Sequence, residues 1–246
     1  MFFFKRRRAT SFPPATGKVE VFIRHCLSSS ASKHKKRPPG FSHRNCYENF
    51  LQTTDLGKVN VTCWLDLGPE GKREDHFLDD RFSVVTVREG TEAGSFLKLL
   101  DYVEKKKFPP ETILYFLEDD YLHKPGWVDV LLEGMALPGV DYVTLYDHRD
   151  KYFFPMYASL TSRLFLTAST HWRTVPSTTQ TFAVHYGTLM KDLSIHRRFS
   201  QKRKISADHD KFCKLGKKGA VLISPIPGFS THAEPEYASP FFDIVI

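Results

Sequence analysis

The sequence predicts an α/β domain with a mostly parallel central sheet flanked by helices. Along its 246 residues, runs rich in β-branched and aromatic residues alternate with amphipathic helical segments. Each of these runs is nearly continuously apolar, which is typical of strands buried on both faces of a parallel sheet. Charged residues follow several runs directly, and the carboxyl ends of parallel strands form the ligand-binding edge of such sheets.

The first half of the chain supplies most of the predicted elements. We expect strands at residues 19–23, 59–65, 83–87, 112–117 and 142–146. We expect helices at residues 42–54, 91–107 and 125–135. Ser42 precedes the first helix as an N-cap, and the lysines that end the second helix complement the negative end of its dipole.

The second half differs in character. Residues 164–170 and 181–185 look like a pair of extended segments, and we expect a small antiparallel element on the acceptor side. Residues 191–216 are polar and basic, a strand is expected at 220–223, and a Pro/Gly loop then presents His232. We find no internal repeat and no long linker. The prediction is a flexible basic and aromatic arm at 1–17 and a single domain at 18–246, with halves at 18–150 and 151–246.

The net charge of +7 is divided between segments of opposite sign. Residues 1–50 carry +9 and residues 191–218 carry +7, whereas residues 51–190 carry −6 and residues 219–246 carry −3. A uniformly basic protein would indicate a nucleic acid or an anionic membrane as partner. This partition does not, so we expect no nucleic-acid partner, and only the N-terminal arm suggests peripheral contact with a membrane surface.

Several features indicate a cytoplasmic protein. No stretch approaches the ~18 consecutive apolar residues of a membrane span, so no transmembrane segment is expected. The first residues, MFFFKRRR, place a short apolar run before the charges, which is the reverse of a secretory signal. The four cysteines are few and irregularly spaced, which favours reduced thiols.

Three carboxylates, Glu118, Asp119 and Asp120, follow the most strand-like run of the chain. Adjacent carboxylates repel one another and are costly to desolvate unless a cation compensates them. A hard divalent cation held by one or two carboxylates together with ligand phosphates is a common solution. An exposed acidic turn is the alternative, but the buried strand before the cluster places it at the ligand edge. The cluster therefore predicts metal or diphosphate binding.

Asp208 and Asp210 form a second acidic focus within a strongly basic stretch. A carboxylate at a helix N-terminus and among cations stays ionised at neutral pH, ready to accept a proton. Helix capping by Ser206 or Asp208 explains one of these residues but not both aspartates. The pair therefore contains a candidate general base.

Weaker candidates stand elsewhere at strand ends and in loops. Asp66 can bond a base or ribose hydroxyl, or simply cap a turn. Gly94 can admit a close phosphate or merely soften the first helical turn. His232, taken alone, is more often structural than a ligand. A zinc site is conceivable, but its spacing fits no standard pattern; it would consist of His25, Cys26, His43 and Cys46.

Two of these segments resemble motifs of the metal-dependent glycosyltransferases of the GT-A fold. The segment YFLEDD, residues 115–120, resembles their DxD motif in its E-x-D form. The segment SADHDKFCKL, residues 206–215, resembles the S-E-D-x-D-L-x-x-x-L segment of inverting, family-2-like members, with Ala207 in place of Glu and Lys211 in place of Leu. The segments YFLEDDYLHKPGW and YDHRDKY are similar to segments of a subset of these glycosyltransferases from bacteria and from large DNA viruses of algae. The resemblance covers residues 18–234.

The resemblance implies a role for each matched residue. Asp120 and His232 would hold Mn²⁺ or Mg²⁺. Glu118 and Asp119 would touch the donor sugar or ribose, Asp66 the uracil or ribose, and Arg24 the nucleotide, with Gly94 near the phosphates. Asp208 would be the catalytic base, with Asp210 as the alternative. The implied fold is a GT-A, Rossmann-like sheet with a small antiparallel element on the acceptor side.

The expected function is transfer of a sugar from a nucleotide-diphospho-sugar, a UDP-sugar by preference, to a glycan or glycoprotein hydroxyl with inversion. If the source is viral, the expected location is the host cytoplasm. Tyr152, Trp172 and Tyr186 are candidates to stack on the acceptor, although aromatic residues of this kind also serve as core. The alternative function is a metal-dependent nucleotidyltransferase or nucleic-acid enzyme that uses the same carboxylates.

Overall fold

The computed structural model describes residues 17–26, 35–73 and 76–243, so the predicted arm lies outside the described residues except for Gly17. The strands are β1 (Val19–Cys26), β2 (Val59–Asp66), β3 (Ser83–Val87), β4 (Ile113–Glu118), β5 (Tyr121–His123), β6 (Tyr142–Val143), β7 (Leu164–Leu166), β8 (His171–Thr174), β9 (Phe182–His185), β10 (Leu222–Ile226) and β11 (Ser230–His232). The α-helices are α1 (His43–Thr53), α2 (Glu92–Lys106), α3 (Trp127–Ala136), α4 (Asp150–Phe153), α5 (Tyr186–Arg198) and α6 (Asp208–Lys217). Pro155–Tyr157 and Pro235–Tyr237 form 3-10 helices.

The central sheet has nine strands in the order β3-β2-β1-β4-β9-β6-β10-β8-β7. β8 and β9 run against the other strands, so the sheet is mostly parallel, as predicted. β5 and β11 form a separate antiparallel pair. In the parallel register, Cys26 lies opposite Asp66 and Arg24 lies opposite Glu118. The charged ends of β1, β2 and β4 therefore meet at one edge of the sheet.

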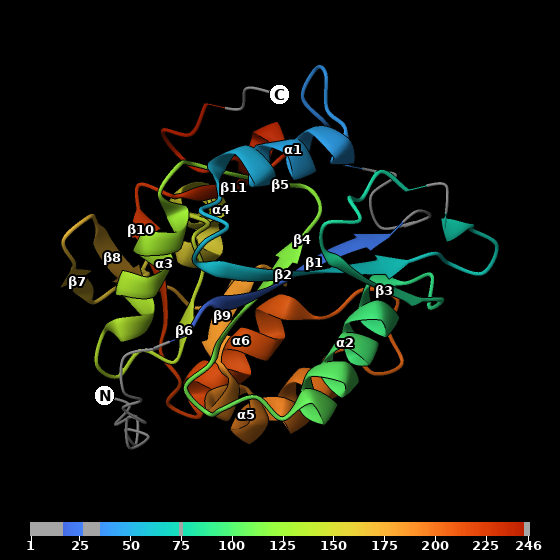
Figure 1. Cartoon of the computed structure of the whole chain (residues 1–246). Helices are drawn as coiled ribbons and strands as arrows, with labels where there is room; N and C mark the ends of the chain where they lie inside the picture. The colour runs from blue at the N-terminus through green and yellow to red at the C-terminus, as the bar shows by residue number, and fades with distance from the viewer. Residues whose placement is uncertain (1–16, 27–34, 74–75, 244–246) are drawn as a thin grey trace.

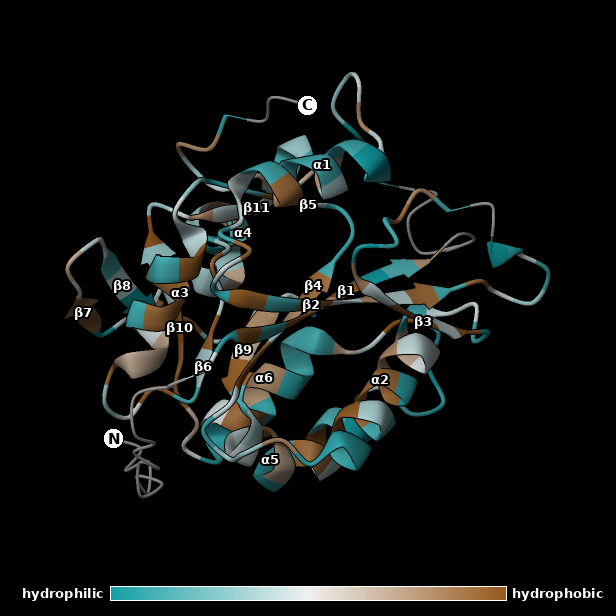
Figure 2. Ribbon diagram, in the orientation of Figure 1, coloured by the Kyte–Doolittle hydropathy of each residue, from teal (hydrophilic) through white to brown (hydrophobic). Residues whose placement is uncertain are grey.

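Helices cover both faces of this sheet (Figure 1). Because side chains alternate along a strand, β1 directs Val21 and Ile23 to one face and Phe22 to the other. The first face packs against α1 and α3, and the second against α2, α5 and α6. Figure 2 shows hydrophobic residues concentrated along the central strands. The result is a three-layer domain with a core on each side of the sheet.

Most of the predicted elements are confirmed, but two expectations were wrong and one element is arranged differently. The expected strand at 142–146 ends at Val143, because the carbonyl of Leu145 accepts hydrogen bonds from Phe229 and Ser230 instead of continuing the ladder. The extended segments at 164–170 and 181–185 both contain strands, but these strands do not pair with each other. Instead β7 pairs with β8, and β9 inserts between β4 and β6. The helix α5 was missed, because basic residues at its end hide the spacing of Leu189 and Leu193.

The packing of α3 on β8 leads to a stability prediction. A β-carbon added at Gly134 of α3 would lie 2.7 Å from Cη2 of the buried Trp172. We expect Gly134→Ala to destabilise the fold by about 1–3 kcal/mol through overpacking. Gly216→Ala is the matched control, since Gly216 also lies in a helix but its added β-carbon would meet nothing within 4 Å. Urea unfolding of both variants tests this; equal stability would contradict the tight contact.

Candidate functional site

A cleft of about 570 Å³ opens at the carboxyl edge of β1 and β4. It is lined almost entirely by polar and charged side chains, namely Arg24, His25, Lys35, His43, Glu92, Ser95, Glu118, Asp119 and Asp120, together with Cys26. Five of the residues that we singled out from the sequence are therefore not scattered. Arg24 and the three carboxylates share one cleft, and His232 contacts Asp120 beside it.

Asp120 is the most heavily paired of the three carboxylates. Its Oδ2 accepts hydrogen bonds from Lys35 at 2.9 Å and from Arg37 at 2.8 Å, and lies 2.9 Å from Nε2 of His232. Burial disfavours its charge, but His232, Lys35 and Arg37 more than offset this and hold the pKa of Asp120 well below its usual range. Its Oδ1 is buried and has no hydrogen-bond partner among the described residues. Asp120 therefore stays ionised, with one oxygen free to accept a further ligand.

His232 is brought to Asp120 by the antiparallel pairing of β11 with β5. In this register His232 lies opposite Tyr121, the residue after Asp120, and the backbone N–H of Ala233 donates to the Asp120 carbonyl at 2.8 Å. The other ring nitrogen of His232 lies 3.3 Å from a carboxylate oxygen of Glu234. Burial lowers the pKa of His232, but Asp120 and Glu234 raise it above the ordinary value overall. A carboxylate on the second nitrogen is the usual way to orient a histidine ligand.

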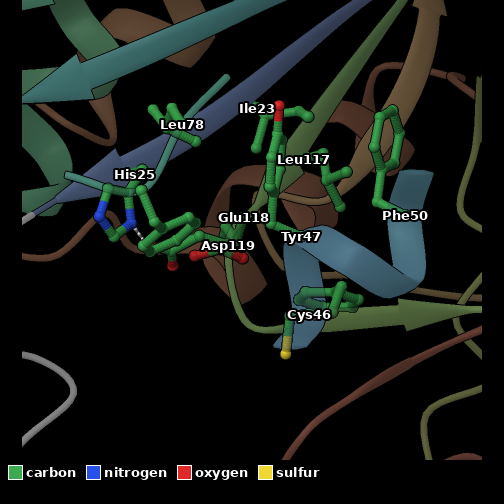
Figure 3. Close-up of a pocket in the computed structure, with 11 residues that line it drawn as sticks. Ile23, His25, Cys46, Tyr47, Phe50, Leu78, Leu117, Glu118 and Asp119 are labelled. Carbon is green, nitrogen blue, oxygen red and sulfur yellow. Dashed lines mark hydrogen bonds and ion pairs between the residues drawn. The ribbon is translucent and has the colours of Figure 1, made fainter. Parts of the chain in front are cut away.

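Asp119 belongs to a different cluster on the other side of the turn. Its two carboxylate oxygens contact Nδ1 of His25, at the end of β1, and Nδ1 of His43, at the start of α1. Figure 3 shows the His25 ring and the Asp119 carboxylate directed at one another, beside apolar residues of α1 and β4. The three residues have ligand atoms within 4.8 Å of one another, so they could hold a metal ion. The conceivable zinc set is thus corrected: His25 and His43 do converge, but on Asp119 and not on Cys26 and Cys46.

Glu118 lies between these two clusters and opposite Arg24. Burial and the neighbouring charge of Asp120 raise the pKa of Glu118 to about 7, although Lys35 and Arg24 oppose the shift. Arg24 itself donates to Oε1 of Glu92 at 2.9 Å and to the Glu92 carbonyl at 2.8 Å. Glu118 is therefore a group in the cleft whose charge changes near neutral pH, and added positive charge would favour its ionised form.

Asp208 lies on the first turn of α6, close enough to Arg24 and Glu92 for their charges to affect its titration. Burial raises the pKa of Asp208 to about 6, against the opposing effect of Lys211. The fully buried Lys211 ammonium donates to Asp208 at 3.1 Å and to Gln180 at 2.7 Å. Asp210, by contrast, is exposed. The N-cap of α6 is Ala207 and makes no side-chain cap, so Asp208 is not used as a capping residue.

Glu92 links the cleft to the segment that carries Asp208. While Oε1 of Glu92 accepts from Arg24, Oε2 accepts the backbone N–H of Ser206 at 2.7 Å. Burial acts to raise the pKa of Glu92, but the positive charge of Arg24 and the hydrogen bond from Ser206 hold it below its ordinary value. A single carboxylate thus fixes the start of α6 against β1, and so fixes the position of Asp208 relative to the cleft.

Two strand-end and loop candidates have structural partners. The carboxylate of Asp66 is fully buried, and its oxygens accept backbone N–H groups of Gly68, Glu89 and Gly90 at 2.9–3.1 Å. It holds the turns after β2 and β3, so the expected nucleotide contact is corrected to the turn-capping alternative. Gly94 donates its N–H to Oγ1 of Thr91, the N-cap of α2, and a β-carbon there would lie 2.7 Å from that oxygen.

The three aromatic residues predicted to contact the acceptor differ in their burial. Trp172 is fully buried against α3, and Tyr186 packs in the core beneath α2 with its hydroxyl directed at the Glu104 carbonyl. Both are core residues, which corrects their expected contact with an acceptor. Tyr152 remains 52% exposed on α4, with Arg173 over its ring and its hydroxyl donating to Asp147 at 2.7 Å. Tyr152 stays a candidate for acceptor binding.

Four further residues of this site were missed as site residues by sequence reasoning: Lys35, Arg37, Glu92 and Lys211. The first two lie in the basic, polar segment after β1, and that concentration of charge was a usable signal. Glu92 and Lys211 carry no such signal, because each is one charge among many and acquires its role from a partner distant in sequence.

The likeness to one solved structure confirms a GT-A-like fold. A crystal structure of GalNAc-T7 with UDP, GalNAc and Mn²⁺ superposes with a TM-score of 0.58 at 10% identity, over 90% of this chain and 44% of that chain. This chain thus spans less than half of the GalNAc-T7 chain that it matches. A structure of CMP:2-keto-3-deoxy-manno-octonic acid synthetase with CTP aligns at 15% identity with a TM-score of 0.46, over 89% and 95% of the two chains.

Other comparisons define the limits of that likeness. No protein-family model matches the chain, and no curated protein sequence does. The structural likeness supports the fold but not the resemblance to viral and bacterial members. Within the part of the chain that the structure describes, no helix is both long and apolar enough to cross a membrane.

Proposed function

We propose that this protein is a metal-dependent glycosyltransferase that transfers a sugar from a nucleotide-diphospho-sugar, preferably a UDP-sugar, to a hydroxyl of a glycan or glycoprotein. The observation that carries the proposal is the contact of Asp120 with His232 at 2.9 Å, across 112 residues of sequence, at the carboxyl edge of the sheet. The fold supports the same class, since the GalNAc-T7 structure that it resembles contains UDP and Mn²⁺.

Asp120 and His232 fit a divalent cation. They supply a carboxylate oxygen and an imidazole nitrogen, and Oδ1 of Asp120 is a buried acceptor without a partner among the described residues. Oxygen ligands with one imidazole suit Mn²⁺ or Mg²⁺, and Mn²⁺ accepts imidazole more readily. When bound, such a cation offsets the negative charge that develops on the departing diphosphate.

The remaining residues of the cleft position the donor. Arg24, held by Glu92, lies on the floor of the cleft beside Glu118. Glu118 and Asp119 accept hydrogen bonds from hydroxyls of the ribose or of the donor sugar. Gly94 lies in the first turn of α2, whose positive N-terminus favours phosphate.

Asp208 acts as the general base. Its carboxylate takes the proton of the acceptor hydroxyl while that oxygen forms a bond to the anomeric carbon of the donor sugar. The bond between that carbon and the diphosphate oxygen breaks, and its electron pair leaves with the nucleoside diphosphate. Because this is a single displacement, the configuration at the anomeric carbon inverts. Tyr152 is the aromatic residue that we assign to the acceptor.

Thermal stabilisation by nucleotide tests the proposed class. We expect UDP with Mn²⁺ to raise the melting temperature, UDP alone to raise it much less, and single-stranded DNA to have no effect. At a UDP concentration one hundred times its Kd, the stabilisation is about 2.7 kcal/mol. Stabilisation by DNA without an effect of UDP would contradict the glycosyltransferase and favour a nucleic-acid enzyme.

A further inference from the structure

The ammonium group of Lys35 occupies the position that a metal ion would need. Its Nζ lies 2.9 Å from Oδ2 of Asp120 and 3.0 Å from Nε2 of His232. Both atoms belong to the carboxylate and the imidazole that we assign to the divalent cation. A metal ion bonded to both at ~2.1 Å would lie in contact with the ammonium, so the two cations exclude one another.

Arg37 contacts the same oxygen but is held more firmly. Its guanidinium also donates to the carbonyl of Ala233 at 3.0 Å and lies over the ring of Phe41 at 4.2 Å. Its side chain is 15% exposed, whereas that of Lys35 is 30% exposed. Among the residues that the structure describes, Lys35 makes hydrogen bonds only to Asp120 and His232, and its flexible stem can turn to a new partner. Of the two cations, Lys35 is the one able to move.

The charges of the cleft indicate where it moves. With Lys35 and Arg37 in place, the negative charge of Asp120 is already compensated. A divalent cation alone would therefore leave this end of the cleft with an excess of positive charge. A divalent cation that arrives with a nucleoside diphosphate adds little net charge. The diphosphate also offers oxygen acceptors to the displaced ammonium, next to the position that it leaves.

We propose that Lys35 is an exchanging counter-ion: it neutralises Asp120 beside His232 in the metal-free site and transfers to the donor diphosphate when the divalent cation binds. This inference rests on the proposed function. It makes Lys35 a donor-binding residue, and it makes the binding of cation and nucleotide mutually dependent. Each must strengthen the other by the same factor, because the coupling between two ligands is reciprocal.

The test compares Lys35→Met with Lys36→Met, the neighbouring exposed lysine. Free Mn²⁺ is measured by electron paramagnetic resonance during titration of the full chain, with and without UDP. For Lys35→Met we expect Mn²⁺ to bind about tenfold more tightly than to wild type when UDP is absent. We expect UDP to bind about tenfold more weakly when Mn²⁺ is saturating. Lys36→Met should resemble wild type in both titrations.

The opposite signs of the two effects distinguish exchange from a structural role. Weaker binding of both ligands to Lys35→Met, or equal behaviour of the two variants, would overturn the inference while leaving the proposed function standing. UDP binding that depends on Lys35 in a wild-type protein that binds no Mn²⁺ would also overturn it, because Lys35 would then replace the metal permanently. A wild-type protein that binds neither ligand would refute the proposed function itself.

Discussion

Asp208→Asn should abolish sugar transfer while leaving donor binding intact. Asparagine keeps the size of the side chain but cannot accept the proton of the acceptor hydroxyl. General-base catalysis contributes about 10²–10⁴-fold, so we expect a loss of kcat in this range. UDP should still stabilise the variant in the presence of Mn²⁺, because Asp208 is not among the residues that line the donor cleft. The rate is measured as UDP release that depends on acceptor.

Asp210→Asn is the matched control, because this exposed aspartate lies on the same first turn of α6. It should retain most of the transfer activity. The opposite pattern, an active Asp208→Asn and an inactive Asp210→Asn, would move the base to Asp210. Analysis of the product linkage by NMR then tests the expected inversion.

The pH profile of the wild-type enzyme gives a second, independent test of Asp208. The carboxyl must be deprotonated to act as a base, and burial raises its pKa to about 6. We therefore expect kcat to be constant above this pH and to fall about tenfold per unit below it. Donor and Mn²⁺ are kept saturating, so that the titration of Glu118 in the donor cleft does not contribute. A profile without an acid limb near pH 6 would argue against Asp208.

Asp120→Asn should eliminate the dependence of UDP binding on the metal ion. The amide lacks the charge that favours a divalent cation, and it leaves Lys35, Arg37 and His232 without the negative charge that they share. We expect the Mn²⁺-dependent part of the stabilisation by UDP to disappear. In wild type this part is the total stabilisation with Mn²⁺, about 2.7 kcal/mol at a UDP concentration one hundred times the Kd, less the stabilisation by UDP alone. Differential scanning fluorimetry with UDP, with and without Mn²⁺, measures this quantity.

The control for this variant is Asp129→Asn, a change at an exposed aspartate of α3 that pairs with Lys58. It should retain the full effect of Mn²⁺. The ligand-free Asp120→Asn protein is expected to melt lower than wild type, since removing one partner of a buried ion pair leaves the other charges uncompensated. The test therefore depends only on the difference between the melting temperatures measured in UDP with Mn²⁺ and in UDP without it. An unchanged difference would remove Asp120 from the proposed metal site.

The sequence by itself determined the framework of the domain and the location of its acidic centre. The apolar runs of β1 and β4 identify these strands, because a strand buried on both faces is apolar along most of its length. β2 and the edge strand β3 are less buried, and their β-branched residues identify them. Residues that directly follow such a strand lie at its carboxyl end whatever the rest of the chain does. The placement of Glu118, Asp119 and Asp120 at the ligand edge was therefore a local consequence of the sequence.

Only the tertiary structure decided which side chains meet. The contact of His232 with Asp120 depends on the pairing of β11 with β5, and the link from Arg24 through Glu92 to Ser206 joins three distant segments. Periodicity does not encode such contacts, since they arise from the packing of whole elements. The burial of Asp66 and Trp172 likewise depends on the packing of whole elements.

The two positive side chains that pair with Asp120 show most clearly what the sequence determined and what the fold decided. The sequence showed a basic segment after β1, and it indicated no partner for any one of its charges. The fold brings that segment back over the edge of the sheet, so that Lys35 and Arg37 compensate a buried carboxylate. Burial makes the pairing necessary, because an unpaired carboxylate removed from water is too costly to keep ionised. Which lysine provides the charge depends on geometry that only the folded chain defines.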